Sequence, residues 1–220
     1  MADVPLILYF ARHGESVANQ ADRDGVPRPP DADRLSDHGW EQARGVGERL
    51  RGTGVELVVA SDMRRAQETG QAIAETLGVG GVQTLGALRE VQQSDAFYAA
   101  SPDYGDLATL NWMPTAARDF APPGAESFDA ILARVHAVQR TLSEAAAEQR
   151  VVAVSHHNFL HYFLGAALFG DAFGPQHVVP LFNASHANTG ISIFERKPRR
   201  MDGLDFEGWS LTTWNDQAHL

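Results

Sequence analysis

The chain has 220 residues, of which 44% are hydrophobic and 21% are charged, a composition typical of a globular protein that can bury one substantial core. It contains no cysteine, which excludes disulfide scaffolds, cysteine-based metal sites and thiol nucleophiles. The net charge of −10 disfavours nucleic acid as a partner, because such binding needs many phosphate contacts from clustered Lys and Arg side chains.

The longest apolar runs, residues 4–11 and 162–169, are too short to span a bilayer, and the first lacks the features of a signal peptide. We therefore predict a cytoplasmic protein without membrane contact, built as a single domain over residues 1–220. The one basic run, residues 196–200, holds the only lysine and is interpreted as a solvated hairpin or loop. Oligomeric state stays open.

Three segments share one design, in which a short apolar run is followed by polar residues and then by a helical pattern. They are PLILYFARHGES (5–16), VELVVASDMRRAQETGQAIAETLG (55–78) and RVVAVSHHNFLHYFLGAALFG (150–170). Continuous apolar runs of this length are typical of strands buried on both faces. The sequence thus predicts an α/β three-layer sandwich, with a mostly parallel central sheet and helices on both faces.

Two amphipathic patterns predict helices between these units. The first covers residues 36–52, with Ser36 or Asp37 as the N-cap, and the second covers residues 127–146, with Ser127 as the N-cap. Both apolar faces are interpreted as core.

Later in the chain, residues 189–195 and 209–215 predict two strands that residues 203–208 separate. Three tryptophans in apolar periodic segments are interpreted as core residues: Trp40, Trp209 and Trp214.

Two stretches, residues 20–34 and 92–124, have no clear periodicity. Loops of this length in a compact domain are usually functional or carry structure of their own, so we expect the second to contain short helices and to act as a lid. Four aromatic residues in it are candidates for lining a substrate pocket: Tyr98, Tyr104, Trp112 and Phe120.

Pairs of basic side chains follow the three buried strands. They are Arg12 with His13, Arg64 with Arg65, and His156 with His157. In parallel sheets ligands bind beyond the carboxyl ends of the strands, so these pairs are expected at one edge. Guanidinium groups match phosphate oxygens in a bidentate manner, which favours a phosphoryl group as the ligand. Glu90 follows another short strand-like run and could protonate a leaving alkoxide there.

The ordered motifs resemble those of the histidine phosphatase superfamily, which has the phosphoglycerate mutase-like fold. They are ARHGES with Asn19, LSDHGWEQA, SDMRRAQET, GAESFDAILARV, AVSHHN and NDQAHL, and they extend over nearly the whole chain. RHGE alone would be a weak signal, whereas the ordered set is specific.

This resemblance implies that His13 is the nucleophile and becomes phosphorylated. It places four side chains around the phosphoryl oxygens: Arg12, Arg65, His156 and Asn19. The second histidine is expected to be protonated. Arg64 matches no functional position of the family.

Two positions depart from the family pattern. Glu90 matches the proton donor, but the glycine and tryptophan expected after it are missing, and Asp95 is the nearest substitute. His157 stands where the family usually has glycine, and we expect it to affect substrate binding. A zinc pair formed by His157 and His161 is a competing interpretation, although the HExxH glutamate and a third ligand in register are missing.

The resemblance implies a phosphatase that hydrolyses small phosphate monoesters through a phosphohistidine, without metal or cofactor. A phosphoglycerate mutase is the first alternative, although the chain is short between Glu90 and GAES compared with mutases. A module that binds a phosphorylated partner without turnover is the second. The remaining histidines are interpreted as structural or surface residues: His38, His136, His177, His186 and His219.

Overall fold

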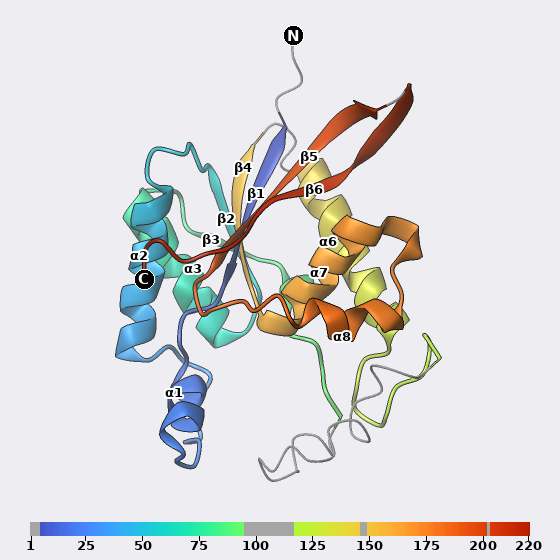
Figure 1. The fold of residues 1–220 in the computed structure, drawn as a ribbon. Coiled ribbons are helices and arrows are strands. Elements are labelled where there is room, and N and C mark those ends of the chain that lie inside the picture. The colour runs from blue at the N-terminus through green and yellow to red at the C-terminus, as the bar shows by residue number, and fades with distance from the viewer. Residues whose placement is uncertain (1–4, 95–116, 146–148, 202) are drawn as a thin grey trace.

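The computed structural model describes residues 5–94, 117–145, 149–201 and 203–220. Its strands form one six-stranded sheet in the order β3-β2-β4-β1-β5-β6 (Figure 1). The strands are β1 (Leu6–Arg12), β2 (Leu57–Ala60), β3 (Val82–Thr84), β4 (Arg150–Ser155), β5 (Ile191–Met201) and β6 (Leu204–Asp216). The helices are α1 (Val17–Asp24), α2 (Asp37–Leu50), α3 (Arg64–Leu77), α6 (Phe128–Ala145), α7 (His157–Phe169) and α8 (Val178–Leu181). Short 3₁₀ turns cover Gly86–Leu88, Gly170–Ala172 and Pro175–His177.

The four strands from β3 to β1 are parallel, and β5 and β6 add an antiparallel hairpin to the open side of β1. Arg12 at the end of β1 pairs with Ser155 at the end of β4, while Ala60 at the end of β2 pairs with Val154. The three strands therefore end together at one edge of the sheet, which confirms the prediction.

Each face of the sheet carries its own core, because side chains alternate along a strand. On β1, Leu8 and Phe10 belong to a cluster with α6, α7 and α8, whereas Tyr9 and Ala11 belong to a second cluster with α2 and α3. Helices thus cover both faces (Figure 1). The predicted three-layer α/β sandwich with a mostly parallel sheet is confirmed.

Helix starts were predictable from capping residues. Ser36 Oγ accepts a hydrogen bond from the Gly39 amide at 3.0 Å at the start of α2, and Ser127 Oγ accepts one from the Ala130 amide at 3.2 Å. The interpretation of residues 20–34 as wholly irregular is wrong for its first part, because α1 extends to Asp24 before Gly25 ends it with a φ of 66°.

The late strands are longer than the apolar pattern predicted. Residues 203–208 do not separate them, since β6 begins at Leu204, and residues 196–200 lie within β5. β5 pairs with β1 only as far as Arg196, so Pro198 lies where β5 has a single neighbouring strand and tolerates a missing N–H. The hairpin projects from the sheet on the side away from α1 (Figure 1).

Trp40, Trp209 and Trp214 pack against the core clusters but are only partly buried. Most of the predicted lid, residues 95–116, falls outside the described residues, as do Tyr98, Tyr104, Trp112 and Asp95; Phe120 is 53% exposed. Within the described ranges, no helix combines the length and apolar character that crossing a membrane requires.

Candidate active site

His13 lies directly after β1, at the edge where the parallel strands end, and is 4% exposed. Its Nδ1 is 2.8 Å from the carbonyl oxygen of Gly14. A carbonyl can only accept, so Nδ1 carries the proton and Nε2 keeps its lone pair. Burial, followed by the charge of Arg65, lowers the pKa of His13 well below its usual value. The ring is therefore neutral, with a fixed tautomer and a lone pair on Nε2.

His156 precedes α7 and faces His13, with the two ring centroids 5.1 Å apart. Arg65 Nη2 donates to His156 Nδ1 at 3.0 Å, so the proton of this ring is on Nε2, which is buried and has no partner among the described residues. Burial, and then the charge of Arg65, lowers the pKa of His156 well below its usual value. The expectation of a protonated second histidine is wrong, because neighbouring guanidinium groups disfavour a further positive charge.

Arg12 and Arg65 supply the positive charge beside these two rings. Arg12 Nη1 donates to the carbonyl oxygen of His186 at 2.7 Å, while its buried Nε has no partner in the described part of the chain. Arg65 also forms an ion pair with Asp33, and its side chain is 16% exposed. Arg64, by contrast, pairs with Glu68 at 2.7 Å on the surface.

Glu90 reaches the same edge and lies at the N-terminus of α7. Its Oε1 accepts backbone N–H groups of Val91 at 2.8 Å and of Asn158 and Phe159 at 3.1 Å each, whereas among the described residues Oε2 accepts from Asn158 alone, at 3.2 Å. Oε1 therefore anchors the side chain, and Oε2 has the weaker hydrogen bonding. The negative charge of Glu90 also raises the pKa of Arg12 against the larger lowering effect of burial.

Asn19 is linked to His13 through Asn188, and its side-chain oxygen is occupied by protein donors. Asn19 Oδ1 accepts from the Ser16 amide at 3.2 Å in the capping box of α1 and from Asn188 Nδ2 at 3.3 Å. Asn188 Nδ2 also donates to the carbonyl oxygen of His13 at 2.9 Å, and sequence analysis missed this residue. The sequence signal that could have marked Asn188 is the polar tripeptide of residues 188–190 before β5, which is typical of a turn. In the structure Thr189 in this tripeptide has a φ of 58°.

His186 fixes the segment that carries Asn188. Its Nε2 lies 2.9 Å from Ser192 Oγ, and it is 2% exposed, so its interpretation as structural holds. Burial lowers the pKa of His186 to about 3. The backbone oxygen of this residue is the acceptor for Arg12, and the segment thus positions the arginine next to His13.

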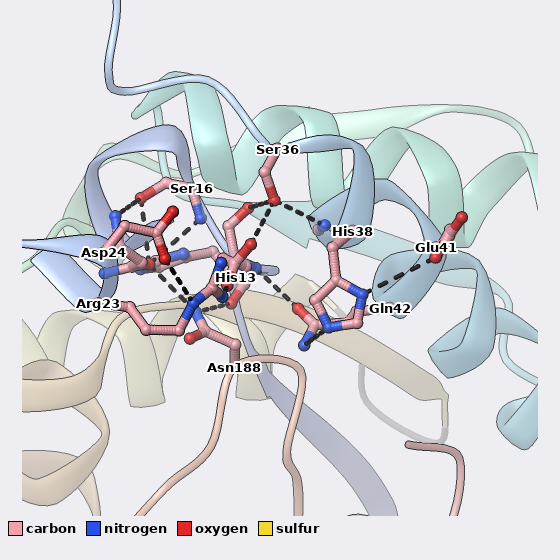
Figure 2. A network of polar contacts seen from close by, with 12 residues as sticks. His13, Ser16, Arg23, Asp24, Ser36, His38, Glu41, Gln42 and Asn188 are labelled. Atoms are coloured by element: carbon pink, nitrogen blue, oxygen red, sulfur yellow. Dashed lines mark hydrogen bonds and ion pairs between the residues drawn. The ribbon is translucent and has the colours of Figure 1, made fainter. Parts of the chain in front are cut away.

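A polar network joins the His13 loop to the starts of α1 and α2 (Figure 2). Glu15 is 7% exposed. Its carboxylate accepts from Ser36 Oγ at 2.7 Å and pairs with Arg23, while its amide donates to Gln42 Oε1 at 2.8 Å. A buried carboxylate satisfied in this way fixes the backbone that carries His13.

Gly39 allows this close approach, because a Cβ at its position would stand 2.0 Å from the backbone oxygen of Glu15. We expect Gly39→Ala to lower the free energy of unfolding by about 1 to 3 kcal/mol, since the contact is with backbone and cannot relax by a rotamer change. Chemical denaturation measures this. Gly80→Ala is the control, since no heavy atom lies within 4 Å of the added Cβ. Equal effects of the two substitutions would contradict the close-contact argument.

His157 lies at the first turn of α7 and stacks on Phe182, with ring centroids 6.0 Å apart and an interplanar angle of 14°. Burial, and then the charges of His161 and Arg12, lowers the pKa of His157 to about 4. The zinc-pair interpretation is not supported, because both ring nitrogens of His161 face carbonyl oxygens, of His157 at 2.7 Å and of Ala184 at 2.8 Å. His161 is a buried structural residue.

The lowered pKa values of four buried or partly buried histidines predict a loss of stability in acid. They are His13, His156, His157 and His186. Below pH about 6.5 the unfolded chain binds protons at these side chains that the folded protein does not bind, so protonation favours unfolding. We expect the free energy of unfolding to fall by up to about 1.4 kcal/mol per pH unit for each residue as pH decreases from 6.5 to 5. Denaturation at a series of pH values tests this, and a constant free energy over that range would contradict it.

The arrangement can carry out nucleophilic chemistry on an anion. The rings of His13 and His156 are neighbours. His13 offers a lone pair on Nε2, and His156 offers an Nε2–H donor that has no partner among the described residues. Two guanidinium groups lie beside them. Fixed donors and positive charges in a buried site stabilise negative charge that develops during reaction.

Comparison with known proteins identifies the family of the chain. The family model of the histidine phosphatase superfamily (branch 1) matches residues 8–217. The 2,3-bisphosphoglycerate-dependent phosphoglycerate mutase of Methylorubrum extorquens (strain PA1) is 33% identical over 164 residues, which cover 70% of this chain and 75% of that protein.

Two solved structures share the fold. The structure described as mycobacterial hydrolase 1 is 25% identical with a TM-score of 0.70, covering 96% of this chain and 99% of its own. A mycobacterial glucosyl-3-phosphoglycerate phosphatase, at 23% identity, also has a TM-score of 0.70 and the same coverage. The match of the family model over residues 8–217 places the chain in the histidine phosphatase superfamily, to which it belongs.

Proposed function

We propose that this protein is a phosphatase that hydrolyses small phosphate monoesters through a phosphohistidine at His13. The observation that carries the proposal is the proximity of two buried rings, His13 with a lone pair on Nε2 and His156 with an Nε2–H that has no partner among the described residues, next to Arg12 and Arg65. A phosphate monoester is the ligand whose charge and geometry suit this set.

In the first step, His13 Nε2 forms a bond to phosphorus while the bond between phosphorus and the ester oxygen breaks. Arg12, Arg65 and the Nε2–H of His156 stabilise the equatorial oxygens. The leaving alkoxide takes a proton from Glu90, whose less strongly bonded Oε2 is suited to carry it.

In the second step, water attacks phosphorus and the bond to nitrogen breaks. The Glu90 carboxylate takes the proton of the water, inorganic phosphate leaves, and the neutral imidazole is restored. Each step uses groups of this chain, so we propose that activity needs no metal or cofactor and persists in the presence of a chelator.

Asn19 and His157 are proposed to act at the substrate side of the site. Asn19 joins the His13 loop to Asn188, and His157 carries an Nδ1 that is buried without a partner among the described residues. A bulky ring in place of the usual glycine is consistent with an altered substrate range.

Phosphoglycerate mutase activity is a second candidate, because the Methylorubrum relative carries that name. A mutase must keep water away from the phosphohistidine until a second hydroxyl accepts the phosphoryl group. Phosphate release and the interconversion of 2- and 3-phosphoglycerate, measured on the same purified protein, separate the two functions. We expect phosphate release. Fast interconversion without release would overturn the proposal, as would no turnover of any phosphate ester.

A further inference from the structure

Eight arginines at or near the catalytic edge, which we define as the edge of the sheet where β1, β2 and β4 end, are already paired with carboxylates. In the described residues the pairs are Arg23 with Glu15, Arg28 with Asp22, Arg34 with Asp31, Arg64 with Glu68, Arg65 with Asp33, Arg89 with Asp62, Arg118 with Asp129 and Arg134 with Glu126. A second anionic group on a ligand would have to compete with an existing carboxylate for each of these cations.

Arg12 is the exception near the nucleophile. It contacts the carbonyl oxygen of His186, and no ion pair to it is found in the described part of the chain. Arg12 and Arg65, which is also paired with Asp33, supply positive charge for one phosphoryl group, and the neutral His156 adds a hydrogen-bond donor. The site therefore holds little surplus positive charge for anything else.

The basic run of the hairpin cannot add to this charge. Arg196 pairs with Leu6 at the beginning of β1, whereas Arg12 and His13 follow the other end of that strand. Residues 197–201 continue further from the catalytic edge, as the projecting hairpin shows (Figure 1).

The longest segment outside the described ranges, residues 95–116, has no basic side chain to add. Residues 95–116 contain no Lys, Arg or His, but they include Asp95, Asp103 and Asp106. Wherever these side chains lie, they add only negative charge to a chain whose net charge is −10.

We propose that the substrate is a phosphate monoester whose organic part carries no second anionic group and is either uncharged or an ammonium. The inference rests on the proposed phosphatase function and narrows its substrate class. It also separates this chain from catalysis on phosphoglycerates, because these carry a carboxylate beside the phosphate and bisphosphoglycerate carries a second phosphate as well.

Two matched pairs of substrates test this charge rule. Glycerol 3-phosphate and 3-phosphoglycerate differ by one carboxylate, and so do phosphoethanolamine and O-phosphoserine. At low ionic strength we expect kcat/KM for phosphate release to be at least about tenfold higher for the carboxylate-free member of each pair. Equal or faster release from the carboxylates would overturn the charge rule and leave the phosphatase in place. Absence of release from all four and from p-nitrophenyl phosphate would overturn both.

A pair of substitutions tests the physical cause. Asp62 follows β2 at the catalytic edge and pairs with Arg89 at 2.9 Å. The positive charge of Arg89 contributes to the lowered pKa of His156, so Arg89 acts electrostatically on the site. Asp62→Asn releases that arginine. We expect it to raise kcat/KM for 3-phosphoglycerate relative to glycerol 3-phosphate by about three- to tenfold.

Glu48→Gln is the matched control. It removes a carboxylate from a similarly exposed pair, Glu48 with Arg51 at 2.6 Å, but near the far end of α2, about 17 Å along the helix from its start. The substrate ratio should not change. An unchanged ratio in Asp62→Asn, or an equal rise in both variants, would contradict the proposal.

Discussion

The substitution His13→Ala is expected to lower kcat for phosphate release by a factor on the order of 10⁴ or more, because it removes the only group proposed to bond to phosphorus. Release of inorganic phosphate from p-nitrophenyl phosphate measures the effect. The fold should persist, since Asn188 bonds to the backbone oxygen of residue 13 rather than to its side chain.

His136→Ala is the control for this loss. His136 lies on α6 and has no proposed part in the reaction, and alanine suits a helix. We expect near-normal turnover. A His13→Ala variant with more than about a tenth of the normal rate would exclude His13 as the nucleophile.

Arg65→Ala is expected to lower kcat/KM by about 10²- to 10³-fold. The substitution removes a cation from the phosphoryl site and also the donor that holds Nδ1 of His156 at 3.0 Å, so both the charge and the orientation of the second imidazole are lost. Arg65→Lys should recover only part of the activity, because an ammonium cannot replace a planar guanidinium that bonds to two groups.

The neighbouring residue provides a stringent control, because Arg64→Ala removes the same charge one position earlier in the same helix. The Arg64 side chain pairs with Glu68 on the surface, so we expect activity close to that of the unmodified protein. Similar losses in both variants would show that the net charge of α3, rather than the contact to His156, supports activity.

The sheet and its catalytic edge were predictable because their signals are local. Apolar runs before Arg12, before Ser61 and before His156 mark buried strands, and parallel strands place their carboxyl ends together. The serine caps of α2 and α6 are equally local. The fold class and the shared edge at which β1, β2 and β4 end followed from these short patterns.

The contacts that fix the site were not predictable in this way. Asn188 bonds to the backbone of His13, 175 positions away, and Thr69 Oγ1 accepts from the Gly14 amide across 55 positions. Such contacts depend on how the loops pack against one another in the folded protein. An isolated polar residue in the sequence does not indicate which residue it will bond to.

The structure differs from the prediction in two further features, the length of the hairpin and the charge of His156, and both depend on contacts between distant segments. The hairpin extends past the apolar pattern because backbone pairing between β5 and β6 continues through charged residues and Pro198. His156 is neutral rather than protonated because Arg65 donates to it, and this contact exists only once β4 and α3 lie side by side. Tertiary contacts, not local propensity, decide both features.

Trapping the phosphorylated protein tests the central claim most directly. The protein is mixed with a radiolabelled phosphate ester, quenched within the first turnovers, and digested to locate the label. We expect label that is labile in acid and stable in base, located on His13, and absent from the His13→Ala variant. Label on any other residue, or label that remains in His13→Ala, would contradict the account.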